Sequence, residues 1–186
     1  PLERVLEMAR SGITPDYIDE MDALGYSSLG AEQLIALRNQ GVSPEYVRGL
    51  AALGYKNLSS EDRIGLPSLG VSPDFVKGLK EQGLQELSLS NLLSLRSQGV
   101  SPQYVAELKQ AGQTDLTLTT LLSLRSQGVS GRYVSEYKAL GYGTLTHNQL
   151  IALRSQGVSP EYVKEFAALG YKNLDTKMLI ALRSQG

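Results

Sequence analysis

Apolar positions along the chain follow two stretches of helical spacing that alternate with each other. In one stretch the apolar residues fall three or four positions apart, as at Tyr46, Leu50 and Leu53. In the other, Leu150 and Leu153 mark a similar stripe. Such spacing places the apolar side chains on one face of a helix. No stretch alternates with the period of two that is typical of half-buried strands, so the pattern predicts an all-α protein.

The two stretches recur together with a fixed period, which glycine marks. This glycine returns every 29 residues, at Gly12, Gly41, Gly70, Gly99, Gly128, Gly157 and Gly186. Six full repeats therefore start at 12, 41, 70, 99, 128 and 157, and a half-repeat occupies residues 1–11. A fixed period of this length is typical of solenoids, whose units bury their apolar faces only against their neighbours. We expect an α-solenoid (a superhelical array) of six two-helix repeats plus an N-terminal half-repeat, forming a single helical repeat domain over residues 1–186.

Each repeat carries start and stop signals for two helices. The first helix opens with an N-capping hydroxyl followed by proline, as at Ser43 and Pro44, and ends at a glycine such as Gly54. The second helix follows a cap such as Thr146 and ends at the glycine that opens the next repeat. These signals predict first helices near 15–24, 44–53, 73–82, 102–111, 131–140 and 160–169, alternating with shorter second helices.

One second helix departs from the pattern. The repeat that starts at Gly41 has Gly65 and Pro67 inside its second apolar stretch. Proline in a helix interior removes a hydrogen bond and costs on the order of 3 kcal/mol. We expect this helix to be short or bent, and both sequence drift and a functional notch explain the departure.

Composition and charge exclude several classes of function. Hydrophobic residues make up 41% of the chain, enough for a sizeable core. The 18 Lys and Arg balance 19 Asp and Glu, so the chain lacks the basic field of a nucleic-acid binder, and we predict no nucleic-acid partner. It has no cysteine, hence no disulfide and no thiolate metal site. No apolar run is long enough to span a bilayer, so we predict no direct membrane insertion.

No group of residues in the sequence points to catalysis. His147 is the single histidine and falls in the first turn of a second helix, as a surface residue would. The chain contains no zinc-peptidase motif, phosphate loop or Ser/His/Asp set, and its acids are spread over all the repeats. We predict that the protein is not an enzyme and uses no catalytic residue, metal or cofactor.

An arginine follows the last core leucine in five of the second helices. These residues are Arg38, Arg96, Arg125, Arg154 and Arg183, and Pro67 replaces the arginine in the remaining repeat. The position falls inside the apolar arc of the helix, where a charge needs partners. We expect a buried stem and a guanidinium bonded to the carbonyls that end its helix or to the acid that opens the next one, as a structural junction. The alternative is an arginine ladder that reads an acidic ligand.

The other face of the second helices carries small and neutral polar residues. Its members in the candidate binding surface are Gln98, Gln127, Gln156, Ser94 and Ser123. One interpretation is that neighbouring second helices approach closely and hydrogen-bond along a ladder. The other is a shallow, uncharged surface that binds a peptide or a sugar.

Aromatic residues occupy two columns. The first column consists of Tyr17, Tyr46, Phe75, Tyr104, Tyr133 and Tyr162, and we expect it in the core. The second follows the glycine that ends the first helix and consists of Tyr26, Tyr55, Tyr142 and Tyr171. A hydrophobic residue there closes the helix end. Because tyrosine is enriched at interface hot spots, the second column also belongs to the candidate binding surface.

The run "GVSPEYVRGLAALGYKNLSSEDRIGL" (residues 41–66) resembles a short helical tandem repeat of bacterial proteins. Such repeats are similar to tails appended to membrane-embedded zinc metallopeptidases of the antirepressor, antibiotic-sensing type. The resemblance covers the whole chain as a repeat pattern, and the zinc motif is absent, so no catalytic role follows from it. It implies an appended sensing or interaction module, placed outside the cytoplasm. Near-identical repeats also fit an engineered array, although Pro67, Gly131 and Gln113 are choices that a consensus design avoids.

Together these features predict a non-catalytic module of a larger chain that binds or senses a protein or peptide. The alternative is a structural spacer or scaffold of fixed length. The last repeat keeps its apolar stripe and has Met178 where other repeats have a polar residue. We therefore also expect self-association through the C-terminal face, since a contiguous apolar patch is commonly an interaction site.

Overall fold

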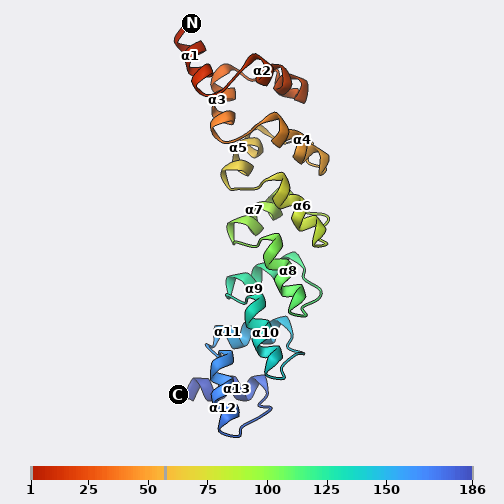
Figure 1. The fold of residues 1–186 in the computed structure, drawn as a ribbon, viewed down its shortest axis with the longest axis vertical. Coiled ribbons are helices and arrows are strands. Elements are labelled where there is room, and N and C mark those ends of the chain that lie inside the picture. Colours follow the sequence, from red (N-terminus) through yellow and green to blue (C-terminus); the bar gives the residue numbers. More distant parts are fainter. Residues whose placement is uncertain (1, 57, 186) are drawn as a thin grey trace. The chain divides into compact units, whose positions relative to one another are not determined.

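A computed structural model describes residues 2–56 and 58–185 of the chain. Thirteen α-helices and no strand lie in these residues, and the helices follow one another through short turns (Figure 1). The predicted all-α architecture of two-helix repeats is confirmed.

The helices alternate between two types. The first-type helices are α2 (Pro15–Met21), α4 (Pro44–Ala52), α6 (Pro73–Glu81), α8 (Pro102–Gln110), α10 (Gly131–Ala139) and α12 (Pro160–Ala168). The second-type helices are α1 (Leu2–Arg10), α3 (Ala31–Asn39), α5 (Ser60–Ser68), α7 (Leu89–Ser97), α9 (Leu118–Ser126), α11 (His147–Ser155) and α13 (Thr176–Gln185). A π-helical turn, η1 (Asp22–Tyr26), extends α2.

Capping fixes both ends of the helices. In α4 the Ser43 hydroxyl accepts from the Tyr46 N–H at 3.2 Å, and Gly54, at a φ of 102°, ends the helix. The N-cap residue and the glycine that ends the helix are equally far apart in both types of helix: Thr146 and Gly157 of α11 have the same spacing as Ser43 and Gly54 of α4. The second-type helices accordingly have nine or ten residues, like most first-type helices. The prediction that they are shorter was wrong.

The proline in α5 does not shorten that helix. It spans nine residues, and Pro67 lies in its last turn, where the missing N–H removes a single bond. The Leu69 N–H still donates to the Gly65 carbonyl, and Leu66 remains buried. The expectation of a short helix was therefore wrong, because the proline comes too late in the helix to end it early.

The chain divides into two compact units. Unit 1 comprises residues 1–81 and 87–96, and unit 2 comprises residues 82–86 and 97–186. The single domain over residues 1–186 stays a prediction. Within each unit a helix packs against the next helix of its own type: α2 on α4, α4 on α6, α1 on α3 and α3 on α5 in unit 1, and α8 on α10, α10 on α12, α9 on α11 and α11 on α13 in unit 2.

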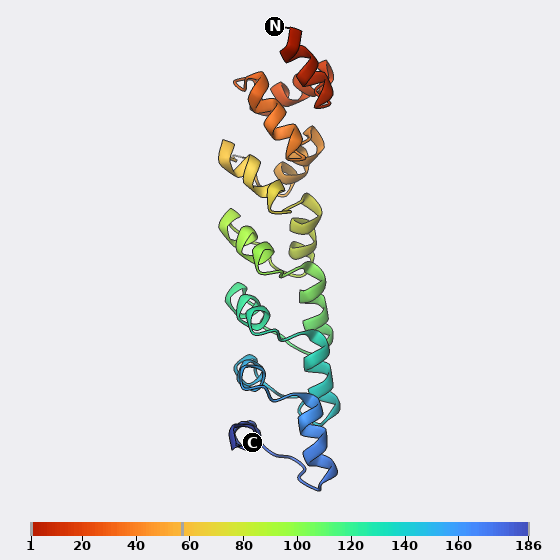
Figure 2. The same ribbon diagram turned by 90° about the vertical axis from the view of Figure 1, so that its left-hand side faces the viewer.

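Figure 2 shows this arrangement within unit 2. The first-type helices form one column, coloured green to blue, and the second-type helices form a second column beside it. Two leucines of α9 and two of α11 point inward: Leu121 and Leu124, like Leu150 and Leu153, have no exposed surface. Burial of such side chains contributes roughly 1.5–3 kcal/mol each before the entropy of ordering the chain is subtracted.

Candidate binding surface

The first aromatic column joins consecutive repeats. Four of its five tyrosine hydroxyls donate to the carbonyl of the valine that follows the first glycine of the next repeat. These bonds are Tyr17–Val42 (3.0 Å), Tyr46–Val71 (2.7 Å), Tyr104–Val129 (2.7 Å) and Tyr133–Val158 (2.9 Å). Tyr104 is 4% exposed, and desolvation raises the pKa of its phenol to about 12. This column is part of the packing between repeats and leaves no free hydroxyl in these four residues for a ligand.

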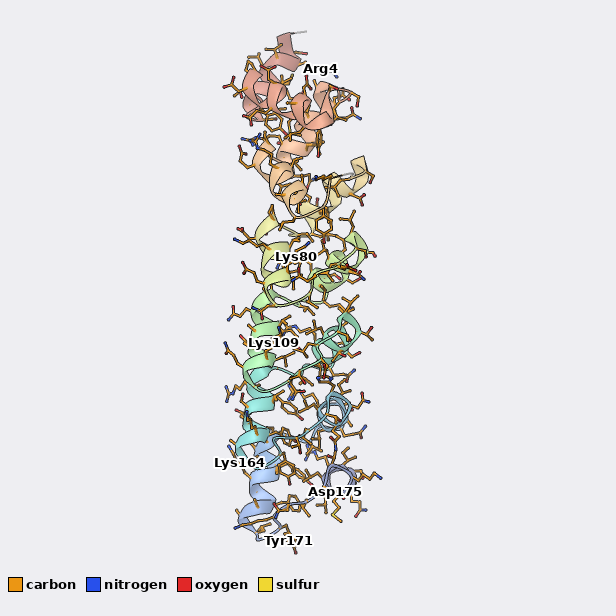
Figure 3. The ribbon with its side chains drawn as sticks, turned by 90° about the vertical axis from the view of Figure 1, so that its right-hand side faces the viewer. Arg4, Lys80, Lys109, Lys164, Tyr171 and Asp175 are labelled. Atoms are coloured by element: carbon orange, nitrogen blue, oxygen red, sulfur yellow. The ribbon has the colours of Figure 1, made fainter. Side chains whose placement is uncertain are left out.

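The second aromatic column has the same kind of role. The Tyr55 and Tyr142 hydroxyls donate to the carbonyls of Leu87 and Leu174, at 2.7 and 2.9 Å. Tyr26, predicted at the surface, is only 2% exposed, because the turn η1 folds its ring into the core of unit 1. Tyr26 is therefore not a surface anchor. Tyr171 differs, with 60% of its surface exposed at the end of unit 2 (Figure 3).

The five arginines lie elsewhere than predicted. Arg38 is half-exposed and the other four are exposed as whole residues, while the burial of their stems stays a prediction. Each guanidinium lies over a ring of the first aromatic column, at centroid distances between 4.9 and 5.2 Å: Arg38 over Tyr17, Arg96 over Phe75, Arg125 over Tyr104, Arg154 over Tyr133 and Arg183 over Tyr162. These contacts are cation–π interactions that join the two helices of a repeat.

The partners expected for the arginines are occupied by other groups. At the end of α9 the Gly128 and Val129 N–H groups donate to the carbonyls of Arg125 and Leu124. The helix therefore closes itself and needs no side-chain donor. Glu161, which opens α12, interacts with Lys164 and Arg132. The arginine therefore contacts the aromatic ring on the preceding helix instead, as Arg125 contacts Tyr104.

Each of these guanidinium groups also covers a glycine that opens a repeat. A Cβ at Gly99, whose φ is 73°, would lie 3.2 Å from Nη2 of Arg125. Gly41 provides the comparison: Pro67 stands where its arginine would be, and a Cβ there would meet nothing within 4 Å. The glycine thus serves both the left-handed turn and the close approach of the arginine.

The glutamines of the candidate surface are exposed, as Gln98, Gln127 and Gln156 all show. Within the described part of the chain, no hydrogen bond involves their side-chain amides. Ser94 and Ser123 lie half-buried on the same helices. The structure thus brings the three glutamines to solvent, buries Tyr26 and leaves Tyr55 and Tyr142 half-buried.

Some hydrogen bonds join neighbouring second-type helices, as the predicted ladder requires. Side chains bond at Arg4–Glu32, at Ser68–Gln40 (2.7 Å) and at Gln149–Thr176 (3.3 Å). None of these three bonds uses a residue of the candidate surface. Instead, α9 and α11 border a shallow hollow of about 360 Å³, lined by Thr119, Thr120, Ser123, Thr146, His147, Asn148 and Ile151. Hydroxyl groups and the Asn148 amide therefore share the lining of this hollow with apolar surface.

Comparison of the chain with protein-family models, curated proteins and solved structures finds no match. Among the described residues, the helices are too short or too polar to cross a membrane, and no three His, Asp or Glu side chains gather as metal ligands would. The case for a function rests on the surface itself.

Proposed function

We propose that this protein is a non-catalytic module that binds or senses protein or peptide segments in unit 2, at the residues that directly follow second-type helices. The observation that carries the proposal is the exposure of Gln98, Gln127 and Gln156, whose amides have no hydrogen-bond partner among the described residues. A primary amide both donates and accepts, as a peptide group does. Three such amides, one per repeat, suit an extended segment.

The division of roles among the side chains supports this surface over the others. The aromatic columns and the inward leucines hold the repeats together, so changing them costs stability. The glutamines make no such contact, and their exposure leaves them free for a partner. The resemblance to repeats of sensing metallopeptidases agrees with a binding role and is part of the same proposal.

The second candidate function is a spacer or scaffold of fixed length. The regular Tyr-to-Val bonds favour it, because identical ties between successive repeats set a constant separation in each unit. A spacer needs no ligand, so the two proposals differ in what they predict for the glutamines.

The experiment selects linear peptides from a random display library on the intact chain. The selected peptides are then titrated against the variant Gln98→Ala/Gln127→Ala/Gln156→Ala. The matched control is Ser135→Ala/Lys164→Ala, at exposed positions of first-type helices; Lys164 lies on that side of unit 2, whereas Asp175 lies on the second-type side (Figure 3). Loss of three hydrogen bonds predicts affinity weakened by roughly tenfold or more, with the control unchanged. Equal binding by both variants, or no selected peptide, would support the spacer.

A further inference from the structure

We propose that three positions of unit 2 each bind one carboxylate, so that the module takes an acidic peptide in extended conformation. This inference rests on the proposed function and names the chemistry of its ligand. Each position, called here a carboxylate position, consists of an exposed glutamine, the glycine after it, and the arginine that covers this glycine. The three are Gln98–Gly99–Arg125, Gln127–Gly128–Arg154 and Gln156–Gly157–Arg183.

The first carboxylate position shows how the groups converge. Nη2 of Arg125 lies 3.2 Å from where a Cβ of Gly99 would be, and Gln98 directly precedes that glycine. The guanidinium carbon lies over the Tyr104 ring, 4.9 Å from its centroid. Arg125 and Gln98 are both exposed. The arginine therefore lies over the glycine that follows an exposed glutamine, and this glycine has no side chain to shield the guanidinium.

The other two positions repeat this geometry. Nη2 of Arg154 lies 3.7 Å from the Cβ position of Gly128, and its guanidinium lies 5.1 Å from the Tyr133 centroid. Nε of Arg183 lies 3.7 Å from the Cβ position of Gly157, and its guanidinium lies 5.2 Å from the ring of Tyr162. Three equivalent positions, one repeat apart, suit a ligand with several charges along its length.

The chemistry of the arginines points to carboxylates. Within the described residues, no hydrogen bond or ion pair links the side chain of Arg125, Arg154 or Arg183 to another group. The guanidinium N–H groups that face away from the glycine therefore remain available. The helices α9 and α11 carry no acidic residue that would compete. A guanidinium matches the two oxygens of a carboxylate with parallel N–H donors. The ring next to it already restricts the position of the guanidinium, which lowers the entropy lost on binding.

Unit 1 contains the separate parts without the complete set. Arg96 stacks on Phe75 and covers Gly70, but the residue before that glycine is Leu69, which is 52% exposed. Arg38 covers Gly12, which follows Ser11. Gln40 precedes Gly41, and Pro67 replaces the arginine there. Arginines of the same packing but without the glutamine thus provide a control inside the same protein.

The test uses fluorescence anisotropy with the intact chain and a labelled peptide of repeating Glu-Gly-Ser. A matched peptide has glutamine in place of glutamate. We expect the glutamate peptide to bind and the glutamine peptide to bind at least roughly tenfold more weakly, the factor expected for one charge-assisted hydrogen bond. Arg125→Gln/Arg154→Gln/Arg183→Gln should lose that binding, whereas Arg38→Gln/Arg96→Gln should retain it.

A second set of variants separates geometry from charge. Arg125→Lys/Arg154→Lys/Arg183→Lys keeps each charge and removes the paired donors, so it should also weaken binding. Circular dichroism and the urea midpoint verify that each variant is folded. Equal binding of the two peptides, an equal loss in the Arg38/Arg96 control, full binding by the lysine variant, or equally tight binding of a single-stranded oligonucleotide would overturn the inference. Neutral library peptides that depend on the glutamines but not on the arginines would do so while leaving the proposed function intact.

Discussion

Replacing Tyr104 with phenylalanine tests how consecutive repeats are held together. The Tyr104 hydroxyl donates to the Val129 carbonyl at 2.7 Å, between the repeats that start at 99 and 128. Both residues are buried, Val129 with 1% of its surface exposed. Tyr104→Phe keeps the ring beneath Arg125 and removes only the hydroxyl, so the change isolates one hydrogen bond.

The magnitude follows from what the carbonyl loses. A buried neutral hydrogen bond contributes about 0.5–1.5 kcal/mol, and a buried acceptor left unpaired costs about 1–3 kcal/mol. We therefore expect Tyr104→Phe to lower the free energy of unfolding by about 1–2 kcal/mol. Tyr133→Phe is the matched control, because the Val158 carbonyl also accepts from Tyr137 at 3.0 Å and keeps that bond. Its loss should be about 0.5 kcal/mol, at the low end for one hydrogen bond.

Urea unfolding followed by circular dichroism measures both variants, with the free energy extrapolated linearly to water. Native-state hydrogen exchange of α8 and α10 gives the local opening free energy, because repeat arrays open in segments. Equal losses of unfolding free energy in Tyr104→Phe and Tyr133→Phe would contradict this expectation, because the remaining bond from Tyr137 to the Val158 carbonyl would then have no energetic effect.

Three further predictions concern pH, a turn and the last helix. Folding raises the pKa of Tyr104 from 10.0 to about 12, so the stability that its protonated phenol contributes is present below pH 10 and is lost as the pH rises toward 12. Urea unfolding midpoints should therefore fall between pH 10 and 12, and they should fall less in Tyr104→Phe. Gly70→Asn should destabilise by about 0.5–1 kcal/mol more than Gly41→Asn in urea unfolding, because its Cβ would lie 2.9 Å from Arg96 and displace the guanidinium; equal losses would contradict the contact. Met178 on α13 is 54% exposed, so sedimentation across a concentration series should show self-association that Met178→Gln weakens. A protein that stays monomeric at every concentration would refute self-association through the C-terminal face.

Much of the fold could be predicted from the sequence because its signals are local and repeat. Ser43 and Gly54 mark the ends of one helix by backbone geometry that needs no tertiary contact, and the 29-residue period copies those signals along the chain. Thr146 and Gly157 are as far apart in the sequence as Ser43 and Gly54, so helices of equal length could also have been predicted from these signals.

The candidate site was harder to predict, because the sequence does not say which neighbouring group a long side chain such as that of Arg125 contacts. The helical spacing predicted Arg125 within the apolar face, but an arginine side chain is long enough to bring its charge to the surface. Its true partner stands 21 residues earlier, in Tyr104, and the same offset relates Arg154 to Tyr133. That regular offset was present in the sequence as a signal. The burial of Tyr26 had no such signal, because it depends on the turn η1 of its own repeat.

We propose a ligand surface in unit 2 at the residues that directly follow second-type helices. Titration of the isotopically labelled intact chain with the Glu-Gly-Ser peptide, followed by NMR chemical shifts, locates the ligand directly. We expect the largest chemical-shift changes at the amide groups of Gln98, Gln127 and Gln156 and at the backbone amides of the glycines that follow them. Shifts concentrated on the first-type helices or around Tyr171 would contradict it.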